Sequence, residues 1–125
     1  MNINNIQKQL ADFADERDWD QFHNPKNLAM ALSVEASELV EIFQWLTPEQ
    51  AEEIMDSSQS DHVKEEVADV MIYLLRLADK LDIDLESIVN DKIVQNGKKY
   101  PVNLSKGNAD KSTSFSSKIK KILEF

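Results

Sequence analysis

Two pairs of carboxylates, each spaced three residues apart, are the side chains of this sequence best suited to chemistry. Glu35 and Glu38 form one pair, and Glu66 and Asp69 form the other. Because residues three apart share one face of an α-helix, each pair presents two acids on the same side. Four converging carboxylates raise one another's pKa values unless a cation lies among them. Oxygen ligands without His or Cys favour Mg²⁺ or Mn²⁺.

The apolar residues around the first pair recur every three or four positions, which is typical of a helix. The predicted buried stripe is Leu28, Leu32, Leu39, Ile42 and Phe43. Glu35 falls within this stripe, where a carboxylate is costly unless something neutralises it, and Glu38 lies on its flank. A solvated acidic face is the alternative interpretation. A di-iron carboxylate bundle is disfavoured, because neither His23 nor His62 completes a Glu-x-x-His pair.

The second pair lies on another predicted helix. Its expected buried stripe is Val63, Val67, Val70, Leu74, Leu77 and Leu81. Glu66, Asp69 and Tyr73 share one flank of that stripe at the helical period. If the two helices pack antiparallel along their stripes, the four carboxylates converge.

Helical periodicity dominates the chain and predicts an all-α bundle of four to five helices, with a carboxylate-lined site between helices. The expected helices cover about 3–17, 25–45, 48–56, 61–81 and 84–97. The buried stripe of the first is expected to be Ile3, Ile6, Leu10, Phe13 and Ala14. Asn24-Pro25 predicts one helix start, Thr47 to Gln50 form a capping box, and Asp84 caps the last helix. Residues 101–115 have no clear period, and a short helix is expected near 116–124.

Composition narrows the function classes. The chain has 125 residues, 14 basic and 23 acidic, so its net charge is −9. That balance disfavours a nucleic-acid-coating surface and a polybasic membrane surface. The imbalance is local, because residues 35–69 hold 11 acids and one Lys, whereas residues 70–125 hold 7 acids and 10 bases.

The cysteine and glycine counts and the lengths of the apolar runs exclude further classes of protein. Cysteine is absent, which excludes a disulfide or thiolate site and favours a cytoplasmic location. No run of about 18 apolar residues and no signal peptide is evident, so no membrane association is expected. Two glycines are too few for a glycine-rich phosphate loop or a β-sandwich.

Several segments together resemble a known family. Residues 17–45 contain FHNP and FQW, residues 65–85 contain the second acid pair, and residues 92–102 contain KKYPV. The tail 104–113 is also similar. With these segments the chain resembles the all-α nucleotide pyrophosphohydrolases of the MazG-like superfamily, in particular the dCTP pyrophosphatase branch.

The resemblance implies Mg²⁺-dependent hydrolysis of a nucleoside triphosphate, dCTP or a modified dCTP, to the monophosphate and pyrophosphate. It gives the metal role to Glu35, Glu38, Glu66 and Asp69, and either Glu35 or Glu38 would orient the attacking water. The residues implied to contact substrate are Trp19, Trp45 and Tyr73 at the base or sugar, and Lys92, Asn96, Lys99 and Tyr100 at the phosphates. Leu10 stands where some relatives carry His, and Lys99 stands where relatives often carry Arg.

The resemblance also implies an intertwined homodimer or homotetramer. Residues 1–100 would form the catalytic domain, and residues 101–125 a tail that packs on or completes the site. Two alternatives remain open: a house-cleaning hydrolase of broad dNTP preference, and a non-catalytic helical dimerisation module.

The aromatic and basic residues have competing explanations on residue type alone. Trp19 lies in a polar loop, where it would either stack on a base or plug the core. Trp45 and Tyr73 lie on the carboxylate side of their helices and would line a nucleotide pocket or a dimer interface. Lys92 and Lys99 would face phosphates or complement a helix C-terminus. His23, before Asn-Pro, is expected to make a structural hydrogen bond.

Overall fold

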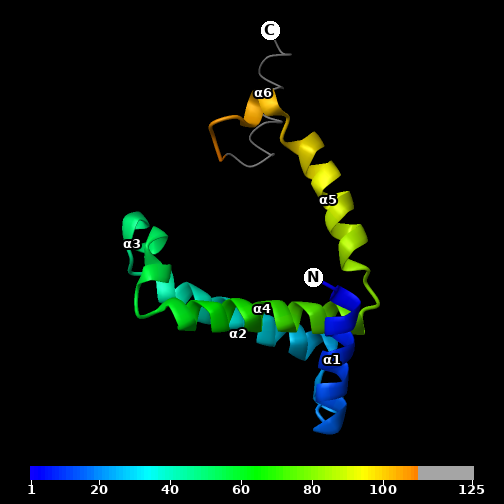
Figure 1. Ribbon diagram of the computed structural model, residues 1–125. Helices are drawn as coiled ribbons and strands as arrows, with labels where there is room; N and C mark the ends of the chain where they lie inside the picture. Colours follow the sequence, from blue (N-terminus) through cyan, green and yellow to red (C-terminus); the bar gives the residue numbers. More distant parts are fainter. Residues whose placement is uncertain (110–125) are drawn as a thin grey trace. The chain divides into compact units, whose positions relative to one another are not determined.

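The computed structural model describes residues 1–109. Every regular element in that range is a helix (Figure 1), which confirms the all-α prediction. The chain divides into two compact units, residues 1–83 and 84–125, and each is described here by itself. The helix expected near 116–124 lies outside the described residues. Among residues 1–109, no helix is long and apolar enough to cross a membrane.

The first unit opens with α1 (Ile3–Glu16), whose first turn is capped by the side chain of Asn2. The helix ends at Arg17, and Asp18 adopts a left-handed conformation with φ 55°. A single 3₁₀ turn, η1 (Asp20–Phe22), follows. This segment between α1 and the next helix is short and carries Trp19 and His23.

α2 (Pro25–Phe43) starts as the sequence predicts. The Asn24 side chain accepts a hydrogen bond of 2.8 Å from the backbone N–H of Asn27, and Pro25 occupies the first turn. The capping box of Thr47 and Gln50 is present at α3 (Pro48–Glu52). The single helix expected over 48–56 is divided, because the chain continues as a separate 3₁₀ turn, η2 (Ile54–Asp56).

α4 (Ser60–Lys80) is the longest helix of the first unit and packs antiparallel beside α2 (Figure 1). The most deeply buried residues of the core are Ala14, Leu28, Leu75 and Ala78. α1 also contacts α4, where the Gln7 side-chain N–H donates to the Leu75 carbonyl at 3.1 Å. α4 is therefore the element against which both α1 and α2 are packed.

The predicted stripe of α4 is partly wrong. Val63 is buried as expected, but Val67, Leu74 and Leu81 are 37–51% exposed. The buried residues of α4 are Val63, Glu66, Leu75, Arg76 and Ala78. Val67 lies one turn after the buried Val63 and Leu74 one turn before the buried Ala78, so the packing of α1 and α2 covers this face of α4 only in part. The stripes of α1 and α2 are mostly half-buried or buried, except that Phe13 is 47% exposed.

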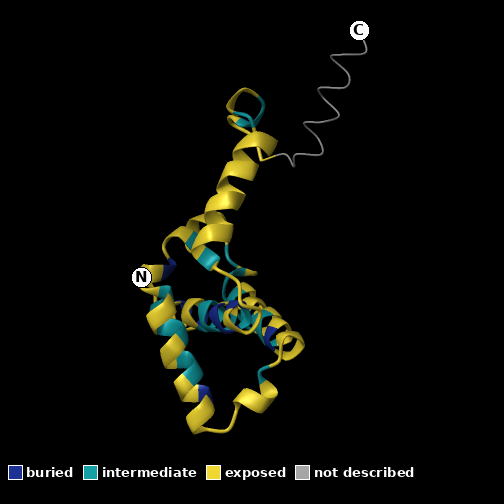
Figure 2. Ribbon diagram, turned by 90° about the vertical axis from the view of Figure 1, so that its right-hand side faces the viewer, coloured by how far each residue is buried: buried dark blue, intermediate teal, exposed yellow. Residues whose placement is uncertain are grey.

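The second unit consists of α5 (Leu85–Lys99) and, within its described part, α6 (Val102–Ser105). The Asp84 side chain caps α5 as predicted, by accepting from the Ser87 N–H. The helix was expected to end near Gly97 but continues to Lys99. Pro101 then stops it, because a residue before proline is disfavoured in the helical conformation. α6 is a helical turn in a stretch where the sequence has no clear period. Figure 2 shows α5 exposed along almost all of its length.

Truncation of Leu28 tests the α2–α4 core. Leu28 is only 1% exposed, so Leu28→Ala should lower the free energy of unfolding by about 3 kcal/mol through lost burial and a residual cavity. Leu28→Met, which keeps the volume, should cost less than about 1.5 kcal/mol. Urea unfolding of both variants measures these changes. A loss of less than about 1.5 kcal/mol in both variants would mean that Leu28 is not tightly packed.

Candidate metal and active site

The two carboxylate-bearing helices bring three acids together. One oxygen each from Glu35 and Glu38 of α2 and Glu66 of α4 lie within 4.8 Å of one another. Their convergence follows from the antiparallel packing of α2 on α4, which places the middle of one helix against the first half of the other (Figure 1). Glu66 is buried, and Glu35 and Glu38 are half-buried.

Electrostatics at this cluster strongly disfavour three negative charges. Burial, followed by the neighbouring carboxyl of Glu38, raises the pKa of Glu35 to about 7. Burial and Glu38 also raise the pKa of Glu66. Like charges in a partly dehydrated place explain both directions. Without a cation, the cluster therefore retains a proton up to near-neutral pH.

Two oxygens of the cluster have no hydrogen-bonding partner in the part of the chain that the structure describes. They are the buried Oε2 atoms of Glu35 and Glu66. A buried acceptor without a donor costs free energy. Unsatisfied carboxylate oxygens in a cluster of three acids are a donor set of the kind that a hard divalent cation takes.

Asp69 lies on α4 one turn after Glu66 and is half-buried. It is not among the three acids whose oxygens lie within 4.8 Å of one another. Its negative charge nevertheless contributes to the raised pKa values of Glu35 and Glu66. The structure thus brings three of the four predicted ligands into one cluster, with the fourth close enough to act on it electrostatically.

His62, which is exposed at the start of α4, lies beside the cluster. Its Nε2 is 3.5 Å from Oε1 of Glu66, which makes an ion pair when the imidazole is protonated. Its Nδ1 lies 3.3 Å from the Gln59 side-chain oxygen. The spacing of four residues between His62 and Glu66 was the available signal, because such residues are neighbours on a helix.

The three predicted aromatic contacts lie in different surroundings. Trp19 is 46% exposed and packs edge-on against Phe13, with ring centroids 5.8 Å apart, so it does not plug the core. Trp45 follows α2 and is 85% exposed. Tyr73 lies on α4 and is half-buried. Large exposed indoles are surfaces that a planar ligand or a partner chain can cover.

The predicted phosphate-facing residues all belong to the second unit. Lys92, Asn96 and Lys99 lie on α5 at spacings that place them on one helix side, and all three are exposed. Tyr100 follows the helix, and its backbone N–H donates to the Asn96 carbonyl at 2.8 Å. Their grouping on α5 is as the sequence predicts, and their roles stay predictions.

This chain is similar to a known protein family, to curated relatives and to a solved structure. The model of the MazG-like family matches residues 30–115. dCTP pyrophosphatase 1 of Rattus norvegicus is 42% identical and that of Homo sapiens is 39% identical, each over 112 residues. The alignment covers 89% of this chain and 66% of each relative, so the chain spans just under two thirds of their length.

The similarity extends to a solved structure. A pyrophosphatase from Archaeoglobus fulgidus is 39% identical and superposes with a TM-score of 0.75, covering 81% of this chain and 94% of that one. The family model covers more than half of the chain and includes both acid pairs. The chain therefore belongs to the MazG-like family, as its sequence motifs indicated.

Proposed function

We propose that this chain is a Mg²⁺-dependent nucleoside triphosphate pyrophosphohydrolase that acts on dCTP or a modified dCTP. Water attacks the α-phosphorus, the bond between that phosphorus and the bridging oxygen to the β-phosphate breaks, and the monophosphate and pyrophosphate are released. The relatives named dCTP pyrophosphatase support the substrate class.

The observation that carries this proposal is the cluster of Glu35, Glu38 and Glu66. A solvated acidic face, the alternative interpretation of the sequence, does not bury Glu66 or leave two carboxylate oxygens without donors. A bound divalent cation would supply the positive charge that lets a triphosphate approach these acids. The ligands would be Glu35, Glu38, Glu66 and Asp69, with Mg²⁺ as the ion and Mn²⁺ as its substitute.

The remaining residues would bind and orient the substrate. Glu35 or Glu38 orients the attacking water by accepting its hydrogen bond, which is the task of a general base. Lys92, Asn96, Lys99 and Tyr100 of the second unit hold the phosphates. Trp19, Trp45 and Tyr73 enclose the base and sugar, since aromatic faces stack on any base.

Leu10 favours a second candidate, a house-cleaning enzyme of broad dNTP preference. Leu10 is half-buried on α1 and offers no polar atom. A site that lacks a hydrogen-bonding group at this position rejects a wrong base only weakly, because apolar contacts discriminate less than unpaired polar groups do.

We further propose that the functional form is a homodimer or homotetramer. In the first unit, Val67, Leu74 and Leu81 lie along one side of α4 and its end and are 37–51% exposed. In the second unit, Ile88 and Ile93 of α5 are 47–63% exposed. Exposed apolar residues grouped on one helix are typical of protein interfaces. The cytoplasmic location stays a prediction from the absence of cysteine.

A nucleotide panel tests the activity. Pyrophosphate should be released from dCTP or its 5-modified forms in the presence of Mg²⁺, and release should stop in EDTA because the carboxylates alone repel a triphosphate. Comparable rates for the four dNTPs would favour the broad-specificity enzyme. No metal-dependent release from any nucleotide would leave the non-catalytic dimerisation module.

Neutral variants test the ligand assignment. Glu38→Gln and Asp69→Asn should each lower kcat/KM by about 100-fold or more, as expected when a group that binds the ion or orients the water is removed. Glu41→Gln is the matched control, because Glu41 lies on α2 and is exposed outside the cluster. Near wild-type activity in either test variant would show that the acid has been assigned wrongly.

The raised pKa of Glu35 predicts a dependence of stability on pH. In the folded protein Glu35 ionises near pH 7 rather than at its ordinary 4.5, so the unfolded chain releases this proton first. The metal-free protein should therefore lose stability as pH rises from about 5 to about 7. Glu35→Gln should flatten this dependence, whereas Glu41→Gln should retain it.

Mg²⁺ should stabilise the wild-type protein more at pH 8 than at pH 5.5, because binding requires deprotonated ligands. Thermal unfolding with and without Mg²⁺ at both values measures the effect. An equal shift at both values would mean that the ion binds elsewhere.

A further inference from the structure

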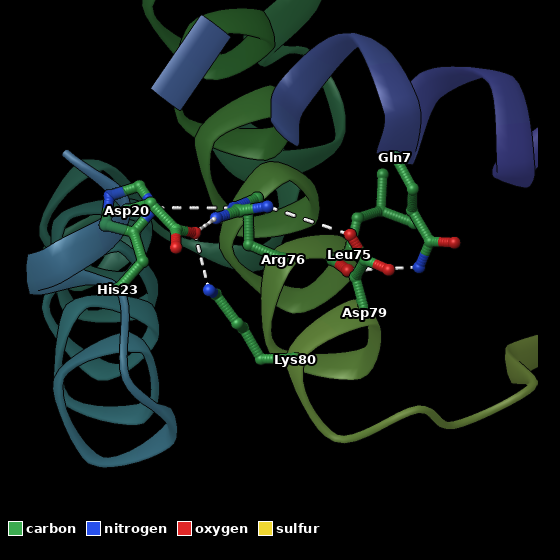
Figure 3. A network of polar contacts seen from close by, with 7 residues as sticks. All are labelled: Gln7, Asp20, His23, Leu75, Arg76, Asp79 and Lys80. Carbon is green, nitrogen blue, oxygen red and sulfur yellow. Dashed lines mark hydrogen bonds and ion pairs between the residues drawn. The ribbon is translucent and has the colours of Figure 1, made fainter. Parts of the chain in front are cut away.

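α4 carries a buried arginine, Arg76, at a distance from the acid cluster. Arg76 is only 3% exposed and lies ten residues after Glu66, about 15 Å further along the helix axis. A guanidinium removed from water needs partners for its charge and its donors. Arg76 finds them on its own helix and in the segment between α1 and α2 (Figure 3).

Each nitrogen of the guanidinium has a separate partner. Nη2 donates to Oδ1 of Asp20 at 3.2 Å, and Nε donates to Nδ1 of His23 at 3.3 Å. Nη1 lies 3.7 Å from Oδ2 of Asp79, one turn further along α4. Asp20 also accepts from Lys80. Figure 3 shows Asp20 and His23 facing α4 together, so the fork of one side chain attaches two points of the segment.

The attached residues hold the chain directly after Trp19. Asp20 follows it directly, and the Trp19 carbonyl accepts from the Phe22 N–H at 2.8 Å. On its other side, the Trp19 N–H donates to the Ala14 carbonyl at 2.8 Å. The indole is half-exposed and rests on Phe13 alone among the ring contacts of the described residues. The backbone hydrogen bonds on both sides of Trp19 therefore help to set the position of the indole.

The ion pairs of Arg76 are not expected to contribute much to the stability of the fold. Replacing a buried ion pair by an apolar side chain of similar volume is often neutral or stabilising, because the charge no longer has to be dehydrated. Asp20 and Asp79 are 49% and 42% exposed, so water can solvate both if the arginine is removed. What the planar fork supplies, and an apolar residue cannot, is a fixed geometry for the two contacts.

We propose that Arg76 is a positioning residue that sets the place of Trp19 for nucleotide binding by fixing residues 18–23 to α4. This inference rests on the proposed function, in which Trp19 contacts the base. It predicts that loss of Arg76 impairs binding of the nucleotide and leaves the carboxylate chemistry intact, because the polar partners of Arg76 within residues 1–109 are Asp20, His23 and Asp79 and not the acid cluster.

The test compares Arg76→Met with Arg76→Lys and with the control Lys8→Met, which removes an exposed cation from α1. Arg76→Met should raise KM for dCTP about tenfold, equivalent to about 1.4 kcal/mol, with kcat within about twofold of wild type. Arg76→Lys should be intermediate, because an ammonium is a point charge that cannot hold both contacts in one plane. Lys8→Met should match the wild type.

Fluorescence of Trp19 tests the attachment of residues 18–23 to α4 independently of catalysis. In a Trp45→Phe background Trp19 is the only tryptophan, and Arg76→Met should increase its quenching by acrylamide without nucleotide present. If Arg76→Met does not fold, Asp20→Asn is measured in its place, since it keeps the buried arginine and removes the charge that the arginine holds.

The outcomes separate the two proposals. Unchanged KM and unchanged quenching in a folded Arg76→Met variant would overturn the inference and would mean that Lys80 or the local turns suffice to hold the segment. A fall in kcat with KM unchanged would also overturn it. A wild-type protein that hydrolyses no nucleotide would refute the proposed function and the nucleotide-binding role with it, while the quenching would still show whether Arg76 anchors the segment.

Discussion

The burial of like charges between α2 and α4 is the constraint on which the first unit depends. The packing of α2 on α4 brings Glu35, Glu38 and Glu66 together. Apolar burial favours the close approach of the helices and dehydrated carboxylates oppose it. The raised pKa of Glu35 reflects this conflict. Any divalent cation bound there would relieve it, so metal affinity and the packing of the two helices are linked quantities.

α4 separates two kinds of charge along one rigid element. Its first half carries Glu66 and Asp69, whereas its last turns carry Arg76 and Lys80, which pair with Asp20 outside the helix. Because the helix is continuous, the distance between the acid cluster and the attached segment is fixed by the rise per residue. α4 can therefore hold the acid cluster and residues 18–23 at a constant distance from each other.

The sequence predicted the features that depend on neighbouring residues, such as helix starts. Asn24, Thr47 and Asp84 cap helices where their side-chain types indicate, and the acid spacing predicted the convergence of Glu35, Glu38 and Glu66. His23 makes the structural hydrogen bond expected of it. Its donor, Arg76, could not be predicted, since the contact spans 53 positions and arginine is usually exposed. α5 continues past Gly97 to Lys99, because proline at position 101 is a stronger stop signal than glycine.

The error in the predicted stripe of α4 carries information of its own. Val67, Leu74 and Leu81 recur every seven residues and so form one line along the helix, and all three are 37–51% exposed. Apolar side chains that are exposed in this way are costly to leave in water. The sequence pattern therefore identified apolar residues of α4 that the packing of α1 and α2 does not bury. A second copy of the chain that covers this face would satisfy both the pattern and the structure.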